Sequence, residues 1–223
     1  MTIRVLTGVI FGAVLAAMPA AAEEAYGPSF DCAKAATAAE KAICDAPLLG
    51  WYDRQLAKTW GLVKKATPAA GEAALKDSQT AFLKAREACV KTQDLYTCLS
   101  DLYIARIRTL ADGVDDMPLS ADSYAAENGG VDIVRYPDNT AAMTISTIGG
   151  NDHTCGFETD EARSGQGSIV TWSEKPDEMY AEACTITATP SADGQTLEVT
   201  ATGDACTYYC GMRAELSGTF ARK

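Results

Sequence analysis

Residues 45–67 read DAPLLGWYDRQLAKTWGLVKKAT, and this stretch sets the fold of the first half of the chain. Its apolar side chains recur once per helical turn, and Asp45-Ala46-Pro47 offers a carboxylate cap followed by a first-turn proline. Thr67-Pro68 ends the pattern. We therefore predict a helix whose apolar stripe faces a protein core rather than a cofactor. The stripe consists of Leu49, Tyr52, Leu56, Trp60 and Val63.

Three further helices are predicted around this one. Thr37-Ala38-Ala39-Glu40 fits a capping box that opens a short helix ending near Cys44. Apolar stripes predict a third helix over residues 72–90 and a fourth over residues 96–111, before Asp112-Gly113. Residues 29–112 are thus predicted to form a small all-α bundle.

The pattern changes after a polar connector at residues 113–128, which we interpret as a linker. From there the apolar period becomes two, and threonine, valine and isoleucine are frequent between glycine, asparagine and aspartate turns. We predict that residues 129–223 form an all-β domain, either an antiparallel sandwich or a small barrel. The expected strands are Val131–Tyr136, Ala141–Ile148, Thr154–Glu158, Ser168–Trp172, Ala183–Thr189, Thr196–Ala201 and Met212–Phe220.

The first 22 residues have the composition of a cleaved signal peptide. Arg4 is their only charge, an apolar run too short to span a bilayer follows, and Pro19-Ala20-Ala21-Ala22 precedes two glutamates. An uncleaved anchor is the alternative. Cys32 does not lie in the small-residue setting of a lipoprotein acceptor, so we expect a soluble, exported, periplasmic protein without a transmembrane anchor.

Eight cysteines in an exported chain indicate up to four disulfides. Four lie in each predicted domain: Cys32, Cys44, Cys89 and Cys98, then Cys155, Cys184, Cys206 and Cys210. Local geometry favours Cys32–Cys44 across the first helix and Cys89–Cys98 across the turn between the third and fourth. A hairpin at Asp193-Gly194 favours Cys184–Cys206, which leaves Cys155–Cys210. Each set of four nevertheless allows three connectivities, and the sequence does not decide among them.

Charge also divides the chain, whose formal net charge is -11. Residues 23–112 contain twelve acidic and twelve basic residues, whereas residues 113–223 contain eighteen acidic and six basic ones. This acidity argues against a nucleic-acid binder. A strongly acidic domain instead steers basic proteins towards itself.

Candidate catalytic and metal-binding residues are few. The single histidine, His153, precedes Thr154-Cys155 beside a glycine turn, and we interpret it as a turn or strand-edge residue rather than as the partner of a nucleophile. Cys206 and Cys210 have the spacing of metal ligands, but disulfides explain them better than zinc does. Adjacent acidic pairs such as Asp160-Glu161 and Asp177-Glu178 suit a solvated face better than a glycosidase cleft. We therefore expect no enzyme activity, no metal and no cofactor.

Several motifs of the first half together match the pattern of one known family: Phe30, Cys32, Thr37 to Glu40, Ile43-Cys44, Pro47-Leu48, Asp53-Arg54-x-Leu56, Arg86-x-x-Cys89, Cys98-Leu99 and Tyr103-x-x-Arg106-Ile107. Through them residues 29–60 resemble the start of the LprI family, which is named after a lysozyme inhibitor. The similarity extends to about residue 111, and the family implies a helical, disulfide-stapled extracytoplasmic domain and, for some members, inhibition of lysozyme. The lipoprotein that names the family has a lipobox, which this sequence lacks, so we do not expect a lipid anchor here.

These observations lead to the hypothesis of a binding protein that protects the cell envelope by occluding a basic muramidase. The alternative is an envelope structural or assembly factor that binds a periplasmic protein or peptidoglycan. Asp53 and Arg54 are either surface contacts or members of a cap or an intra-bundle ion pair. The possible partner contacts are Asp53, Arg54, Asp160, Glu161, Asp177 and Glu178.

Overall fold

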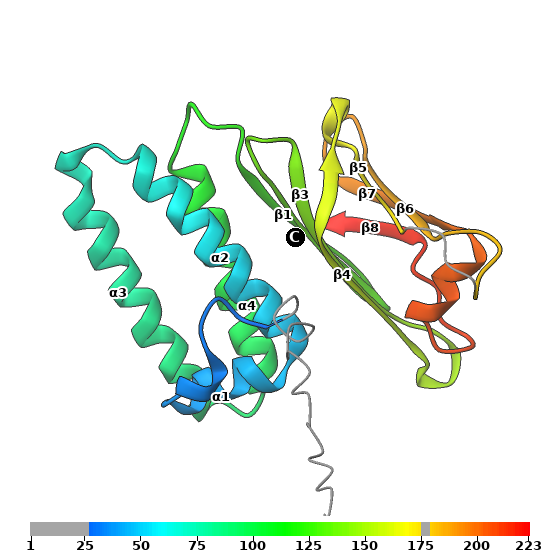
Figure 1. Ribbon diagram of the computed structural model, residues 1–223, viewed down its shortest axis with the longest axis horizontal. Helices are drawn as coiled ribbons and strands as arrows, with labels where there is room; N and C mark the ends of the chain where they lie inside the picture. Colours follow the sequence, from blue (N-terminus) through cyan, green and yellow to red (C-terminus); the bar gives the residue numbers. More distant parts are fainter. Residues whose placement is uncertain (1–26, 175–178) are drawn as a thin grey trace, which may run out of the picture.

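The structure, a computed structural model, describes residues 27–174 and 179–223. Within these ranges a helical part lies beside a β-sheet part (Figure 1). The predicted signal peptide, residues 1–22, lies outside the described residues. No helix in the described ranges is long and apolar enough to cross a membrane.

The helices of the helical part form where the capping residues and apolar stripes of the sequence predict them, with one exception at Asp45. At the start of α1, Glu40 N donates to Thr37 Oγ1 over 3.1 Å and Thr37 N donates to the Glu40 carboxylate over 3.0 Å, which confirms the capping box. The prediction that Asp45 caps the next helix is wrong, because Asp45 is the last residue of α1 and Ala46 is the N-cap of α2. The α-helices of the described ranges are α1 (Ala38–Asp45), α2 (Pro47–Ala66), α3 (Glu72–Ala88) and α4 (Leu95–Asp112).

Disulfides hold the ends of these helices together. Cys32 bonds to Cys44 at the end of α1, and Cys89 bonds to Cys98 across the turn between α3 and α4. Both pairings confirm the connectivity that local geometry favours. Such small helical parts have limited cores, so covalent links that restrict the unfolded chain add to their stability.

The β-sheet part is a closed antiparallel barrel of eight strands, in which β8 returns to pair with β1. Of the two predicted architectures, the chain therefore adopts the barrel. Cys155–Cys210 and Cys184–Cys206 are its disulfides, again as favoured from the sequence. The strands are β1 (Ser120–Ala126), β2 (Gly129–Arg135), β3 (Thr140–Ile148), β4 (Thr154–Ser164), β5 (Val170–Ser173), β6 (Thr185–Pro190), β7 (Thr196–Thr202) and β8 (Gly218–Arg222).

Three strand predictions need correction. The predicted strand Thr154–Glu158 is too short, because β4 continues to Ser164 and pairs with β3 as far as Arg163. Residues 120–126 of the predicted linker form β1, which pairs along its whole length with β2. The predicted strand Met212–Phe220 is too long at its start, because the backbone turns where Ala214 N donates to Gly211 O, and β8 begins only at Gly218.

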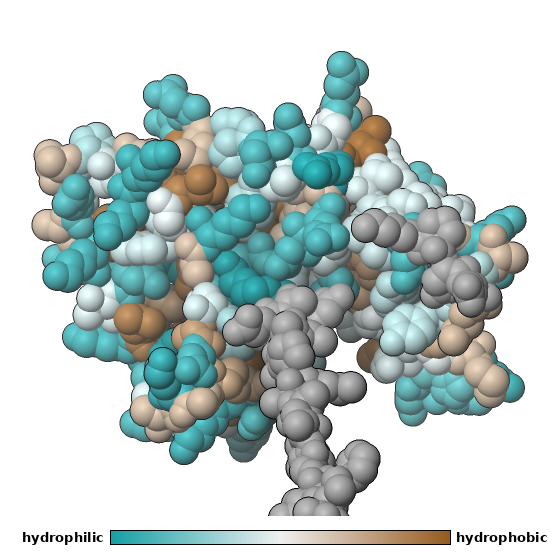
Figure 2. Space-filling view, viewed as in Figure 1, coloured by the Kyte–Doolittle hydropathy of each residue, from teal (hydrophilic) through white to brown (hydrophobic). Residues whose placement is uncertain are grey.

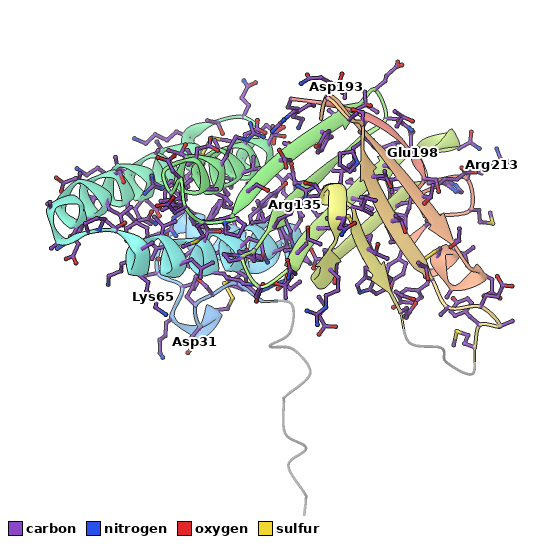
Figure 3. All side chains as sticks on the ribbon, turned by 90° about the horizontal axis from the view of Figure 1, so that it is seen from above. Asp31, Lys65, Arg135, Asp193, Glu198 and Arg213 are labelled. Atoms are coloured by element: carbon purple, nitrogen blue, oxygen red, sulfur yellow. A yellow bond between two sulfur atoms is a disulfide. The ribbon has the colours of Figure 1, made fainter. Side chains whose placement is uncertain are left out.

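Side chains fill the inside of the barrel, as expected for eight strands. One end of this interior is polar: Asp122 accepts hydrogen bonds from Arg135 over 2.6 Å and from Arg222 over 2.5 Å. Figure 3 shows Arg135 near the middle of the molecule, away from Asp31 on the helical side and Glu198 on the barrel side. The largest fully buried apolar side chains of the barrel are Ile133, Met143, Ile145, Ile186, Leu197 and Phe220.

The helices cover the outer face of the first strands of the barrel. Val134 on β2 and Ala142 on β3 are buried in the same hydrophobic cluster as Leu56 of α2 and Leu110 of α4. The chain therefore has one core inside the barrel and a second core shared by the helices and the barrel wall. The division into separate domains at residues 112–129 stays a prediction, since the two parts share this second core.

Candidate binding groove

Helix α2 is joined to strand β4 by polar contacts that its sequence spaces along one face. Trp51 Nε1 donates to the Thr159 carbonyl over 3.3 Å, and Gln55 Nε2 donates to Asp160 Oδ1 over 2.7 Å. Tyr136 OH in turn donates to Gln55 Oε1 over 2.8 Å. Because residues three to four apart share a helix face, this one face fixes α2 against the barrel wall.

Arg54 belongs to the same junction. Its Nε donates to Asp160 Oδ2 over 2.9 Å, and its Nη1 donates to the Gly27 carbonyl over 2.6 Å. Arg54 and Asp160 are both predicted partner contacts from different parts of the chain, and the structure pairs them with each other. Their charges are therefore largely balanced within the protein.

Asp53, by contrast, lies inside the helical part. Its carboxylate accepts hydrogen bonds from Tyr103 OH over 2.8 Å and from both the backbone N and the Oγ of Ser29. It is buried and acts as an internal hydrogen-bond acceptor, which agrees better with a role inside the bundle than with a surface contact. Burial, followed by the neighbouring Asp53 charge, raises the pKa of Tyr103, which stays neutral and donates.

A groove runs along the outer side of β4 next to this junction. Its volume is about 440 Å³. One wall is the β4 backbone with the side chains of Glu158, Asp160 and Glu161, and the other wall is aromatic. The lining residues of this groove, here called the β4 groove, are Arg54, Gly156, Glu158, Thr159, Asp160, Glu161, Trp172, Tyr208 and Tyr209.

The aromatic wall is built by edge-to-face contacts. The ring centroid of Trp172 lies 4.8 Å from that of Phe157, and Tyr209 lies 5.2 Å from Phe157. Tyr208 packs edge-on against Tyr209 at 5.4 Å and is 72% exposed. An exposed tyrosine over a packed aromatic base offers a ring face to a partner.

Both tyrosines come from the short 3₁₀ turn η6 (Asp204–Tyr209), which the chain holds firmly in place. Gly203 enters the turn with φ of 98°, and a Cβ there would lie 2.1 Å from the Ala183 carbonyl oxygen, so glycine is required. Disulfides at Cys206 and Cys210 tie the turn to Cys184 before β6 and to Cys155 on β4.

Glu158 is the least balanced carboxylate of the β4 groove. It is half-buried, and within the described residues its side chain makes no hydrogen bond or ion pair. Burial raises its pKa, an effect that the Arg54 charge opposes and the Asp160 charge reinforces. A carboxylate in this position gains from a cation that enters the groove.

A second hollow lies between β4 and the start of α2. It shares Gly156 and Glu158 with the groove and reaches Pro47 and Leu48 at the start of α2, together with Tyr96. Its volume is about 530 Å³. β4 thus borders two hollows that share two lining residues, at the place where the helical part meets the barrel.

Comparison with known protein families addresses the helical part. Residues 32–110 match the family model Lysozyme inhibitor LprI. The LprI match confirms the resemblance drawn from the sequence, and it includes all four cysteines of the helical part. The barrel and the acidic wall of the β4 groove lie outside it. The chain has no match among curated proteins or solved structures.

The remaining predicted partner contacts do not all lie at the β4 groove. Glu161 is exposed at the groove, whereas Asp177 and Glu178 lie outside the described residues. Sequence reasoning missed Glu158, Trp172 and the two tyrosines. The pair Tyr208-Tyr209 between two cysteines was the available signal, because paired cysteines hold the residues between them at a fixed place.

The other chemistry considered from the sequence finds no support in this geometry. No cysteine of the described ranges is free, so Cys155 cannot act as a thiol nucleophile. No three histidine, cysteine or acidic side chains gather as a metal site in those ranges. His153 follows a turn, where its carbonyl accepts from Gly149 N over 2.7 Å. Its Nδ1 is buried and has no hydrogen-bond partner among the described residues.

Proposed function

We propose that this protein is a periplasmic lysozyme-binding inhibitor that protects the cell envelope by occluding a basic muramidase. The single observation that carries the proposal is the LprI match over residues 32–110, which covers both disulfides of the helical part. The acidic barrel fused to that region supports a basic partner.

The charge of the barrel is available for such a partner. Two of its six basic residues, Arg135 and Arg222, are bonded to Asp122 at one end of the barrel and do not offset the outer carboxylates. The resulting negative field accelerates encounter with a basic protein and weakens as salt screens it.

The polarity of the described surface supports reversible occlusion of a soluble partner. On the face shown in Figure 2 the hydrophobic residues are scattered among hydrophilic ones rather than gathered into a broad patch. A polar, charged interface of this kind suits a soluble partner that binds and dissociates. Inhibition then needs only that the bound chain covers the muramidase cleft, with no covalent step.

A wall-clearing assay tests the proposal. Purified, oxidised mature protein is added to basic lysozyme and a bacterial cell-wall suspension at low salt, and the fall in turbidity is recorded. The proposal expects the clearing rate to fall as the protein approaches molar equivalence and to recover as salt is raised. An undiminished rate under molar excess at low salt rejects it. Reduced, unfolded protein serves as the control for nonspecific charge effects.

A further inference from the structure

Most of the groove side of β4 has no strand partner. β4 pairs with β5 only through Arg163↔Thr171 and Ser164↔Val170, and at its other end Cys155 forms a single bridge with Cys210. Between these points, residues 156–162 face no strand of the described chain on that side, although β3 pairs along the opposite side. The strand order closes the barrel, but β4 and β5 are hydrogen-bonded only at one end and separate along residues 156–162.

The backbone of Glu158 points into this parted region. On the same side of β4, the Thr154 carbonyl accepts from Gly211 N over 2.8 Å. Backbone groups alternate sides along a strand, so the N–H and C=O of Glu158 face the side that Thr154 faces. An exposed strand edge of this kind is a template for one more strand.

The side chains at this edge determine what such a strand carries. Glu158 is half-buried and has no ion-pair partner among the residues that the structure describes, and Glu161 is exposed beside it. Opposite them, the exposed Tyr208 ring rests on Tyr209. A carboxylate facing an aromatic ring binds a cation through charge and through the negative face of the ring.

We propose that the β4 groove receives an extended segment of the partner that carries lysine or arginine. The segment pairs with the backbone of Glu158 and places its cation between the Glu158 carboxylate and the Tyr208 ring. This inference rests on the proposed function only for the identity of the partner as a basic lysozyme. The site itself is defined by the parted strands and their side chains.

Charge selects against the other occupants of such an edge. Arg54 and Asp160 balance each other at the groove, so an acidic segment meets the remaining charges of Glu158 and Glu161, which is unfavourable at close range. A second copy of this chain brings a net charge of -11 to the contact and is disfavoured for the same reason.

A peptide titration tests the groove independently of lysozyme. The probe is the acetylated and amidated peptide Thr-Lys-Val-Lys-Thr, and the control peptide has glutamate in place of both lysines. Amide chemical shifts and amide exchange rates are measured on the full mature chain. The basic peptide is expected to shift and protect the Glu158 amide and to shift the Trp172 indole N–H, whereas the acidic peptide leaves both unchanged.

Matched variants then separate the groove from general charge. Glu158→Gln is expected to weaken binding of the basic peptide about tenfold, and Tyr208→Leu about fivefold, as for a partly desolvated cation between a charge and a ring. Glu198→Gln removes the same charge from an exposed position on β7 outside the groove and is expected to leave affinity within about twofold, as for a distant screened charge.

The outcomes distinguish this inference from the proposed function. If wild-type protein inhibits lysozyme but the basic peptide leaves the Glu158 amide unshifted, the groove inference is overturned and the function stands. If lysozyme is not inhibited but the peptide binds at Glu158, the function fails and the groove inference stands. Equal weakening by Glu158→Gln and Glu198→Gln, or concentration-dependent shifts at Glu158 without peptide, overturns the groove inference.

Discussion

The Nε atom of Arg54 on α2 lies 2.9 Å from Oδ2 of Asp160 on β4, so the helical part and the barrel are joined by an ion pair. Asp160 also accepts from Gln55 through its other oxygen, over 2.7 Å. The two residues that the sequence offers as separate partner contacts are thus components of one junction. The binding surface that we propose lies beside this junction, at Glu158 and the aromatic wall of the β4 groove.

The junction makes a first prediction about stability. Asp160→Asn weakens the pair with Arg54 and disturbs the bond from Gln55, so we expect the free energy of unfolding to fall by about 1 kcal/mol, as for a partly exposed charged hydrogen bond. Urea unfolding followed by circular dichroism measures the change. Glu161→Gln removes the same charge at the next, exposed residue and is the control, with an expected change within about 0.5 kcal/mol. Equal losses in the two variants would show that the junction contributes nothing specific.

The polar end of the barrel interior makes a second prediction. Asp122→Ala leaves Arg135 buried without its carboxylate, and Arg222 loses the same partner. We expect a loss of about 3 to 5 kcal/mol in the free energy of unfolding, because an uncompensated buried charge is costly. The control is Arg222→Met, at a residue whose side chain is 43% exposed, and its loss is expected to be smaller. A larger loss in the control would contradict the assignment of Arg135 and Asp122 as the buried pair.

The disulfides make a third prediction, about rank order. The Cys155–Cys210 bond spans 55 residues and the Cys89–Cys98 bond spans 9. If the bonds act mainly on the unfolded chain, replacing the first pair by alanine costs about 4 kcal/mol and replacing the second about 2.5 kcal/mol. Thermal unfolding of the two double variants compares them. The reverse order would mean that local packing outweighs the loop-closure effect.

Glu158 makes a fourth prediction, about pH. Burial raises its pKa above that of the unfolded chain, so the folded state binds the proton more tightly, and stability is lost as pH rises from the unfolded pKa through the folded one. Glu158→Gln removes this cost. We therefore expect the variant to be more thermostable than the wild type at neutral pH and to lose that advantage at about pH 3, below the usual glutamate range.

Binding responds to Glu158 in the opposite direction. A basic segment requires the charged carboxylate, so affinity is expected to fall as pH decreases through the raised pKa of Glu158. A wild-type affinity that stays constant from neutral to about pH 4, with stability changing as predicted, would remove Glu158 from the contact.

Local signals account for what the sequence predicted correctly. The capping box at Thr37, the stripes of α2 and α4, and the short cysteine separations all depend on residues close together in the chain. They anticipate the helices and the four disulfides. The choice between a sandwich and a barrel does not depend on such local signals, because it is decided by whether β8 returns to pair with β1.

The remaining differences arise from contacts between distant segments. Residues 120–126 read SADSYAA and show no apolar alternation, yet four consecutive residues of β1 are buried because the barrel interior lies on one side and the helices on the other. The groove likewise depends on where β4 parts from β5 and on the disulfides that position Tyr208. Neither relationship is contained in a local stretch of sequence.

The most direct measurement is co-elution of the oxidised mature protein with a basic lysozyme in size-exclusion chromatography at low salt, with light scattering to give the mass of the peak. The account predicts a complex of defined stoichiometry that forms with wild-type protein and with Glu198→Gln, weakens with Glu158→Gln, and dissociates as salt is raised. Separate elution of the two wild-type proteins at low salt would contradict it.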